Sequence, residues 1–307
     1  MNTEMTSTLR GQGVSLVTPF NAAGEVDFPS LEKLVNLCVT EDADYILALG
    51  PASECSLLNL EEQNRILDFV VEINGGFKPI FVGIASSDTR SAVQRIASMH
   101  LEGVMGVYCA ASNPVASSQS GHIGHFRSIA EASKKPILIQ SPGIKSGHSM
   151  TAETILTLAK EPNVAGVIEC SGDVALNGEL LRNRPVNFSV LCGRDVMALP
   201  LLALGVDGAV TSLGNAFCKS WGAMTHQMLF GSVNEARVTH HAFAPLMRIL
   251  EMEGEPTGIK TILAHLSLCD ARVRLPNTPV SESTKLALYR AIAELPQEAL
   301  VRQEALS

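Results

Sequence analysis

Short apolar runs alternate with longer segments of helical period along most of the chain, and this alternation limits the possible folds more than any other feature. Eight such pairs are present, and the runs expected to form strands are 13–20, 43–50, 79–85, 103–109, 136–141, 164–170, 188–193 and 206–212. Apolar runs that are each followed by a helix are typical of parallel strands buried on both faces. Repeated units without a glycine-rich nucleotide motif favour a closed barrel over an open sheet, because closure leaves no strand edge unpaired. The sequence therefore predicts an α/β fold, a (β/α)8 TIM barrel.

The strand pattern stops after Gly231, and the rest of the chain has helical character. Helices are expected at about 234–251, 257–269 and 282–293, with a short tail from Pro296. We expect residues 1–230 to form the barrel and residues 231–307 to form a C-terminal helical extension of the same unit. A chain of 307 residues is long enough to bury such a core as one domain.

Composition and charge exclude several classes of partner. The net charge of −8 comes without a long basic run, so nucleic acids and anionic membrane surfaces are not expected partners. No apolar run is long enough to span a bilayer. The seven cysteines follow no paired spacing, which indicates reduced thiols in the cytoplasm and no metal site. Only 18% of the residues are charged, and this low fraction favours a homo-oligomer, a tetramer or a dimer.

Functional residues of such barrels lie in the loops that follow the carboxyl ends of the strands. Glu54 follows the second expected strand and is a candidate general acid or base, or alternatively a residue that holds the loop through backbone amides. Lys145 and His148 follow the fifth expected strand and are further candidates for catalysis. Arg194 and Asp195 follow the seventh and are expected to pair with each other.

Two other groups of residues have a functional and a structural interpretation. Cysteines near strand ends suggest thiols in one pocket, although packing in the barrel is the favoured interpretation; they are Cys55, Cys109, Cys170 and Cys192. His122 and His125 stand three residues apart at a helix start, where surface or capping roles are favoured over metal binding. No phosphate-binding loop is present, so no cofactor is expected.

Four motifs in the expected order resemble one known family. GPASECSLL carries Gly50 and Glu54, and NPVASSQSGHIGHF carries Gly121, His125 and Phe126. VDGAVTSLGNAF and LPNTPVSES follow, and their matching residues are Gly208, Ala209, Ser212, Asn215, Pro276 and Pro279. Over about residues 8 to 295 the chain resembles the dihydrodipicolinate synthase and N-acetylneuraminate lyase family. Members condense or cleave 2-oxo acids, usually pyruvate, through an imine on a lysine at the end of strand six.

The resemblance places different residues at the positions that carry this chemistry. The segment AGVIECSGD puts Ile168 at the position of the family's lysine, and isoleucine forms no imine. Pro51 and Ala52 stand in place of two threonines of the family, and Pro114 and Ile139 stand in place of its tyrosine relay. Ser53 and Val210 correspond to further positions of the substrate pocket. Lys145 corresponds to an arginine that grips a carboxylate, so the resemblance implies a small carboxylate-bearing ligand.

Two hypotheses about function follow. The first is a divergent lyase-family enzyme that acts on a small 2-oxo or hydroxy carboxylic acid without a lysine Schiff base. The second is a catalytically silent relative that binds a small acid as a regulator or partner subunit. Both exclude ordinary dihydrodipicolinate synthase or N-acetylneuraminate lyase activity. Several ionisable groups with shifted pKa values in the barrel mouth would favour the enzyme, and an apolar mouth would favour silent binding.

Overall fold

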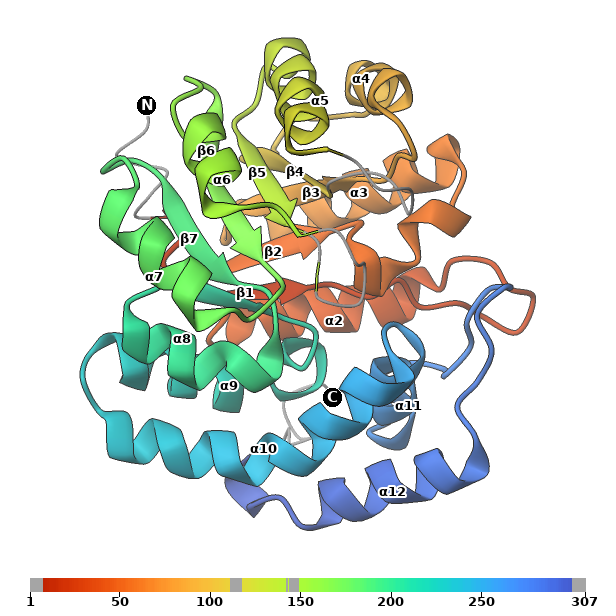
Figure 1. The fold of residues 1–307 in the computed structure, drawn as a ribbon. Helices are drawn as coiled ribbons and strands as arrows, with labels where there is room; N and C mark the ends of the chain where they lie inside the picture. Colours follow the sequence, from red (N-terminus) through yellow and green to blue (C-terminus); the bar gives the residue numbers. More distant parts are fainter. Residues whose placement is uncertain (1–7, 111–117, 142, 144–148, 300–307) are drawn as a thin grey trace.

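Parallel strands form a closed barrel in the computed structural model, which describes residues 8–110, 118–141, 143 and 149–299 (Figure 1). The strands are β1 (Gly11–Ser15), β2 (Tyr45–Ala48), β3 (Ile80–Ile84), β4 (Gly106–Ala110), β5 (Ile137–Ser141), β6 (Val164–Glu169), β7 (Ser189–Cys192) and β8 (Gly208–Thr211). They follow one another around the barrel in chain order, and β8 pairs with β1 to close it. The predicted (β/α)8 barrel is therefore confirmed. Each strand is shorter than its apolar run, because the run continues into the adjoining loops.

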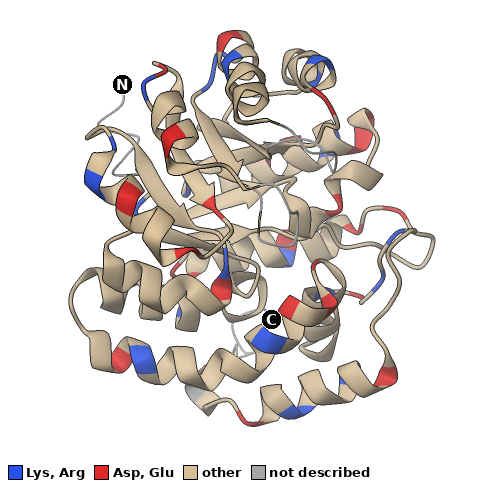
Figure 2. Ribbon diagram, in the orientation of Figure 1, with Lys and Arg blue, Asp and Glu red and all other residues tan. Residues whose placement is uncertain are grey.

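Helices surround this barrel and separate its strands along the chain. They are α2 (Phe28–Thr40), α3 (Leu60–Asn74), α4 (Thr89–Ser98), α5 (Gln119–Ala132), α6 (Ala152–Leu158), α7 (Val174–Asn183), α8 (Ala198–Leu204) and α9 (Gly214–Leu229). Side chains cap the first turns of most of them, as at α3, where Asn59 Oδ1 accepts from Glu62 N at 2.9 Å and Glu62 Oε2 accepts from Asn59 N at 2.9 Å. Figure 2 shows the charged residues mainly on these helices and on loops, while the strands are largely uncharged.

The strands bury two separate apolar clusters, one on each side of the sheet. The larger cluster fills the space between the strands and the helices. The smaller one fills the inside of the barrel and consists of Leu9, Tyr45, Leu47, Phe81, Tyr108, Leu138, Ala165, Ile168 and Leu191. Because side chains alternate between the two faces of a strand, Tyr45 and Leu47 of β2 both belong to the inner cluster, whereas β6 contributes Ala165 and Ile168 across an irregularity in its pairing with β5. This alternation decides which residues reach the barrel mouth.

Three further helices follow the barrel. They are α10 (Val233–Glu253), α11 (Thr257–His265) and α12 (Glu282–Ala293), and a single 3₁₀ turn, Gln297–Ala299, comes after them. Helix α10 contacts α8, α9, α12 and the turn Asp195–Met197 after β7, so it lies close to the carboxyl end of the barrel (Figure 1). Helix α11 ends earlier than expected, and Ser267 adopts a left-handed backbone just beyond it. No helix among the described residues is long and apolar enough to cross a membrane.

Closure of the barrel requires a close approach between the first and last strands. A Cβ atom added at Gly208 would lie 2.2 Å from the carbonyl oxygen of Gly11, which is backbone and cannot rotate away. We therefore expect Gly208→Ala to lower the free energy of unfolding by about 1–3 kcal/mol. Gly124 is the matched control, because it lies on the exposed side of α5 with nothing within 4 Å of its added Cβ.

Urea unfolding followed by circular dichroism measures both substitutions. Gly124→Ala is expected to raise the free energy of unfolding by about 0.5–1 kcal/mol, since alanine favours the helix. Equal effects of the two substitutions would contradict the assignment of Gly208 to the closing seam.

Candidate active site

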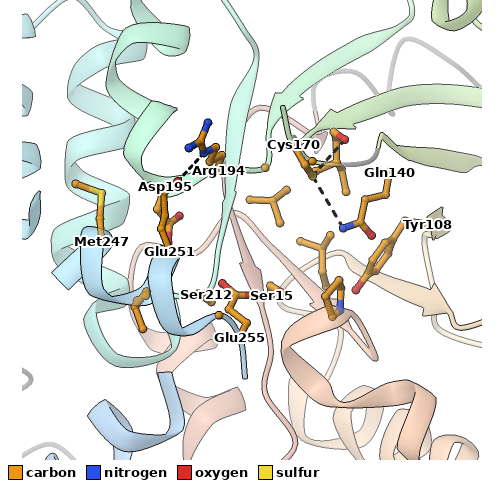
Figure 3. A pocket seen from close by; sticks show the side chains of 18 residues that line it. Ser15, Tyr108, Gln140, Cys170, Arg194, Asp195, Ser212, Met247, Glu251 and Glu255 are labelled. Carbon is orange, nitrogen blue, oxygen red and sulfur yellow. Dashed lines mark hydrogen bonds and ion pairs between the residues drawn. The ribbon is translucent and has the colours of Figure 1, made fainter. Parts of the chain in front are cut away.

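A cavity of about 460 Å³ opens at the carboxyl end of the barrel, where the loops and helix α10 meet (Figure 3). Its apolar floor consists of inner side chains, Leu47, Ile168 and Val210. Tyr108, Gln140 and Cys170 line one side. The opposite side is formed by Asp195, Glu251 and Glu255, which we call the acidic wall, together with Arg194.

Ile168 lies in the floor at the end of β6. Its side chain is 2% exposed and belongs to the inner cluster. The floor is closely packed at this point, because a Cβ atom added at Gly193 on the neighbouring strand's loop would lie 2.8 Å from Ile168 Cγ2 and 2.6 Å from Cys170 Sγ. The following residue, Glu169, points away from the cavity, and its carboxylate accepts from Ser171 N at 2.8 Å, Gly172 N at 3.0 Å and Asn177 Nδ2 at 3.0 Å.

Tyr108 and Gln140 provide the polar groups of the side opposite the acidic wall. The Tyr108 hydroxyl donates to the carbonyl of Ala48 at 3.4 Å, and it comes so close to Gly50 that a Cβ there would lie 1.9 Å from it. Burial raises the pKa of the Tyr108 hydroxyl well above its ordinary value. Gln140 contacts Cys170, with 4.0 Å between Nε2 and Sγ. Burial raises the pKa of Cys170 to about 12, so this thiol stays protonated at neutral pH and is a poor nucleophile.

Helix α10 and the turn after β7 build the acidic wall. Arg194 donates through Nε to Glu251 Oε1 at 2.6 Å and through Nη1 to the Ser171 carbonyl at 3.1 Å. This ion pair ties the β7 loop to α10. Helix α10 ends at Gly254, whose φ of 84° favours glycine, and the chain then carries Glu255 beside Ser212 at the mouth (Figure 3).

Burial raises the pKa values of two carboxyl groups of this wall, Asp195 and Glu255. Burial and the neighbouring Glu255 carboxylate raise the pKa of Asp195 to about 7, although hydrogen bonds from Thr211 and Leu213 oppose the shift. Surrounding protein atoms also raise the pKa of Glu255, and a hydrogen bond from the Ser212 hydroxyl opposes this shift. The Glu255 side chain is nevertheless open to solvent inside the cavity. Asp195 is therefore partly protonated and partly ionised at neutral pH, which suits a group that transfers protons.

Glu54, a candidate acid or base, does not line the cavity. It is buried, with Oε1 accepting from Lys260 Nζ at 2.6 Å and Oε2 accepting from Arg274 N at 2.8 Å and Asn277 Nδ2 at 3.0 Å. Its left-handed backbone, with φ of 56°, turns the side chain away from the barrel mouth and toward α11. The interpretation of Glu54 as a general acid or base is therefore corrected. Glu54 instead anchors the loop after β2, through the buried Lys260 ammonium group as well as through amides.

Three other residues expected in the substrate pocket also lie elsewhere. Ala52 is fully buried beneath the loop, and Ser53 is buried with its hydroxyl donating to the Gly50 carbonyl at 2.7 Å. Ile139 belongs to the outer cluster, because the alternation along β5 turns it toward the helices and turns Gln140 toward the cavity. The expected position was thus shifted by one residue.

Pro51, Ile168 and Val210 do line the cavity, as expected. Pro114, Lys145 and His148 lie outside the described residues. The sequence interpretation missed Tyr108, Gln140 and Glu255. Strict alternation along β4 and β5 identifies the first two, whereas Glu255 carries no local signal because it comes from a turn far along the chain.

Several structural interpretations also need correction. Arg194 pairs with Glu251 and not with Asp195. His122 and His125 are buried within α5, neither exposed nor capping, and His125 Nδ1 lies 2.9 Å from Thr89 Oγ1. Among the described residues, no group of three or more histidine, cysteine or acidic side chains is arranged to hold a metal ion.

Comparison with known proteins identifies the family. The sequence profile of the dihydrodipicolinate synthetase family matches residues 8–295. The chain belongs to this family. A 4-hydroxy-tetrahydrodipicolinate synthase from Parabacteroides distasonis is 34% identical over 288 residues, which cover 94% of this chain and 96% of the relative.

Solved structures of family members have the same architecture. The 4-hydroxy-tetrahydrodipicolinate synthase of Methylacidiphilum fumariolicum SolV superposes with a TM-score of 0.89 at 30% identity, covering 93% of this chain and 95% of that one. The dihydrodipicolinate synthase of Acinetobacter baumannii, solved in complex with pyruvate, superposes with a TM-score of 0.89 at 27% identity, covering 93% and 98%. The chain is therefore a lyase-family barrel over nearly its whole length.

The ion pair of Glu54 with Lys260 gives a test of its structural role. Both side chains are almost completely buried, at 1% and 0% exposure. We expect Glu54→Gln and Lys260→Met each to lower the free energy of unfolding by about 3–5 kcal/mol, because each leaves one buried charge unpaired. The double variant is expected to lose less than the sum of the two.

Urea unfolding of the four proteins measures this coupling. Asp270→Asn is the matched control, since it breaks a pair with Arg272 in which both side chains are about half exposed, and it is expected to cost less than about 1 kcal/mol. Strictly additive losses at Glu54 and Lys260 would contradict a coupled pair.

Proposed function

We propose that this protein acts on a small 2-oxo or hydroxy carboxylic acid without forming an imine on a lysine, and that it lacks ordinary 4-hydroxy-tetrahydrodipicolinate synthase activity. The observation that carries the proposal is Ile168. The resemblance aligns this residue with the family's lysine, and its side chain lies in the cavity floor at the end of β6. An imine requires an amine at the reacting carbon, and isoleucine offers none.

Among the described residues, no other amine near the barrel replaces the family's lysine in the cavity. The described lining of the cavity contains no lysine, and its guanidinium, Arg194, is bound to Glu251. Lys260 is buried nearby in the fold, but Glu54 holds its ammonium group and it does not line the cavity. Burial lowers the pKa of Lys260, while the Glu54 carboxylate opposes this change.

Ionisable groups in the mouth support an enzyme. Asp195, with its pKa near 7, is the described group best suited to exchange a proton with a bound acid at neutral pH. Glu255 lies in the same wall and maintains this shifted pKa by repulsion. The carboxylate of the ligand is assigned to the region of Lys145 by the resemblance alone.

A silent binding protein is the second candidate. The apolar floor of Leu47, Ile168 and Val210 supports it, because these side chains bind the hydrocarbon part of a ligand and supply no chemistry. The acidic wall favours the enzyme over this alternative, since a purely apolar mouth would be sufficient for silent binding.

Reductive trapping tests the absence of an imine. After incubation with pyruvate, and separately with a set of other 2-oxo acids, borohydride reduction is expected to leave the intact mass of the protein unchanged. The Parabacteroides distasonis relative, treated in parallel, serves as the positive control, and Ile168→Lys in this chain is a second control that places an amine in the same cavity. A stable mass gain mapped to Lys145 or to any other lysine of the unsubstituted protein would overturn the proposal.

We further propose that the protein is a cytoplasmic homo-oligomer, with barrel residues 1–230 and extension 231–307 in one unit. The described cysteines are all free, in keeping with a reducing compartment. Large apolar side chains are exposed on the protomer, including Val186, Phe230, Met252 and Leu275.

Sedimentation velocity tests the oligomeric state. At micromolar concentration we expect the mass of a tetramer or a dimer, because subunit contacts would cover these apolar side chains. A single species with the 32.7 kDa mass of one chain would contradict the proposal.

A further inference from the structure

A second cavity adjoins the one at the barrel mouth. It measures about 190 Å³, and the loops that follow β2 and β3 form most of its lining. Three of its lining residues, Pro51, Tyr108 and Gln140, also line the main cavity of about 460 Å³, so the two spaces meet on the side opposite the acidic wall (Figure 3). We call the smaller space the side chamber. Its other described lining residues are Leu49, Gly50, Cys55, Ser56, Gly83, Ile84, Ala85, Ser86 and Ala110.

Tyr108 stands where the two cavities meet, and packing fixes its ring. A Cβ atom added at Gly83 would lie 3.0 Å from Tyr108 Cζ, and one added at Gly50 would overlap the Tyr108 hydroxyl. The ring therefore occupies a slot that these two glycines leave open, and it is buried there. A ligand that reaches from the main cavity into the side chamber must pass beside Gln140 and Pro51, because the Tyr108 ring has no free space to move into.

The side chamber is mainly apolar, and none of its described lining residues is charged. Leu49 and Ile84 supply aliphatic surface and are almost completely buried. Burial raises the pKa of Cys55 to about 11, so this thiol is neutral at pH 7. The Ser86 hydroxyl is already used within its own loop, where it donates to the Asp88 carbonyl at 2.5 Å. A lining of this kind suits hydrocarbon better than a charged or strongly polar group.

We propose that the side chamber receives the hydrocarbon chain of the ligand, so that the acid bound by this protein is a 2-oxo or hydroxy acid with an extended apolar chain rather than pyruvate. The inference rests on the proposed function for the acid head group, which stays in the main cavity with Asp195. Continuity of the two cavities favours this path, since a chain that leaves the head group past Gln140 enters an uncharged apolar space. The opposite direction is unfavourable, because hydrocarbon there would remove water from the carboxyl groups of the acidic wall.

Isothermal titration calorimetry with a homologous series of acids tests the side chamber. Pyruvate, 2-oxobutanoate, 2-oxopentanoate and 2-oxohexanoate share one head group, and each is longer than the last by one methylene. We expect the dissociation constant to fall about four-fold with each added methylene, as the burial of a methylene group requires. A dissociation constant that stays the same along the series would overturn the inference and leave the proposed function intact.

Two substitutions that fill the side chamber locate the effect. Ala85→Phe and Ser56→Phe each add a ring from a different loop, and neither residue belongs to the described lining of the main cavity. Each is expected to leave the affinity for pyruvate within about two-fold and to remove most of the gain along the series. Ala22→Phe is the matched control, at an exposed position outside both described linings. Ser56→Phe gives the decisive result if Ala85→Phe fails to fold, because Ser56 is exposed on a single 3₁₀ turn.

The remaining outcomes separate this inference from the proposed function. A gain along the series that survives both filling substitutions would assign the chain to the floor of the main cavity and overturn the inference. Hexanoate that binds as tightly as 2-oxohexanoate, with the same loss in Ser56→Phe, would support the side chamber and remove the evidence for an oxo acid. Binding of no acid in the series would reject both proposals. If the filling substitutions instead lower the oligomer mass in sedimentation velocity and leave the series unchanged, the side chamber is a subunit contact and the inference is wrong.

Discussion

The alternation of side chains in a closed barrel is the constraint on which the rest of this structure depends. Each strand turns one residue inward and the next outward, apart from an irregularity where β5 pairs with β6. Tyr108 faces the cavity as an inner residue of β4, and Gln140 faces it because it lies two positions from the inner residue Leu138 of β5. Ile139 faces the helices for the same reason. Strand phase therefore decides the floor of the cavity, whereas loops and α10 supply its acidic wall.

The same constraint explains what the sequence can and cannot predict. Apolar runs locate the strands, and their repetition identifies the barrel, because burial on both faces leaves a continuous signal. The place of Ile168 in β6 can also be predicted from the sequence, since the motifs on either side fix the alignment there. The phase of β5 is less certain from sequence, because 136–141 is apolar on both faces, and a shift of one residue exchanges Ile139 for Gln140.

Long-range contacts account for the remaining differences. Glu54 resembles a catalytic carboxylate in a local pattern, yet its partners Lys260, Arg274 and Asn277 are more than two hundred residues away along the chain. Glu255 is the opposite case: it lines the cavity, although nothing beside it in the sequence suggests this. Arg194 could be expected to pair with its neighbour Asp195, but the fold offers Glu251 at 2.6 Å. Such pairings depend on how α10 crosses the barrel mouth, which local patterns do not specify.

Helix α10 links the lining of the cavity to the packing of the C-terminal helices. It contributes Met247, Leu250, Glu251 and Gly254 to the cavity, and it delivers Glu255 through the turn that follows. Five of the eighteen described lining residues thus come from outside the eightfold repeat, on a segment whose other faces pack against α9 and α12. A substitution on α10 can therefore affect both the cavity lining and the packing of the outer helices. A chimera that exchanged barrels but kept the C-terminal helices would combine Glu251 and Glu255 of one parent with Asp195 and the cavity floor of the other.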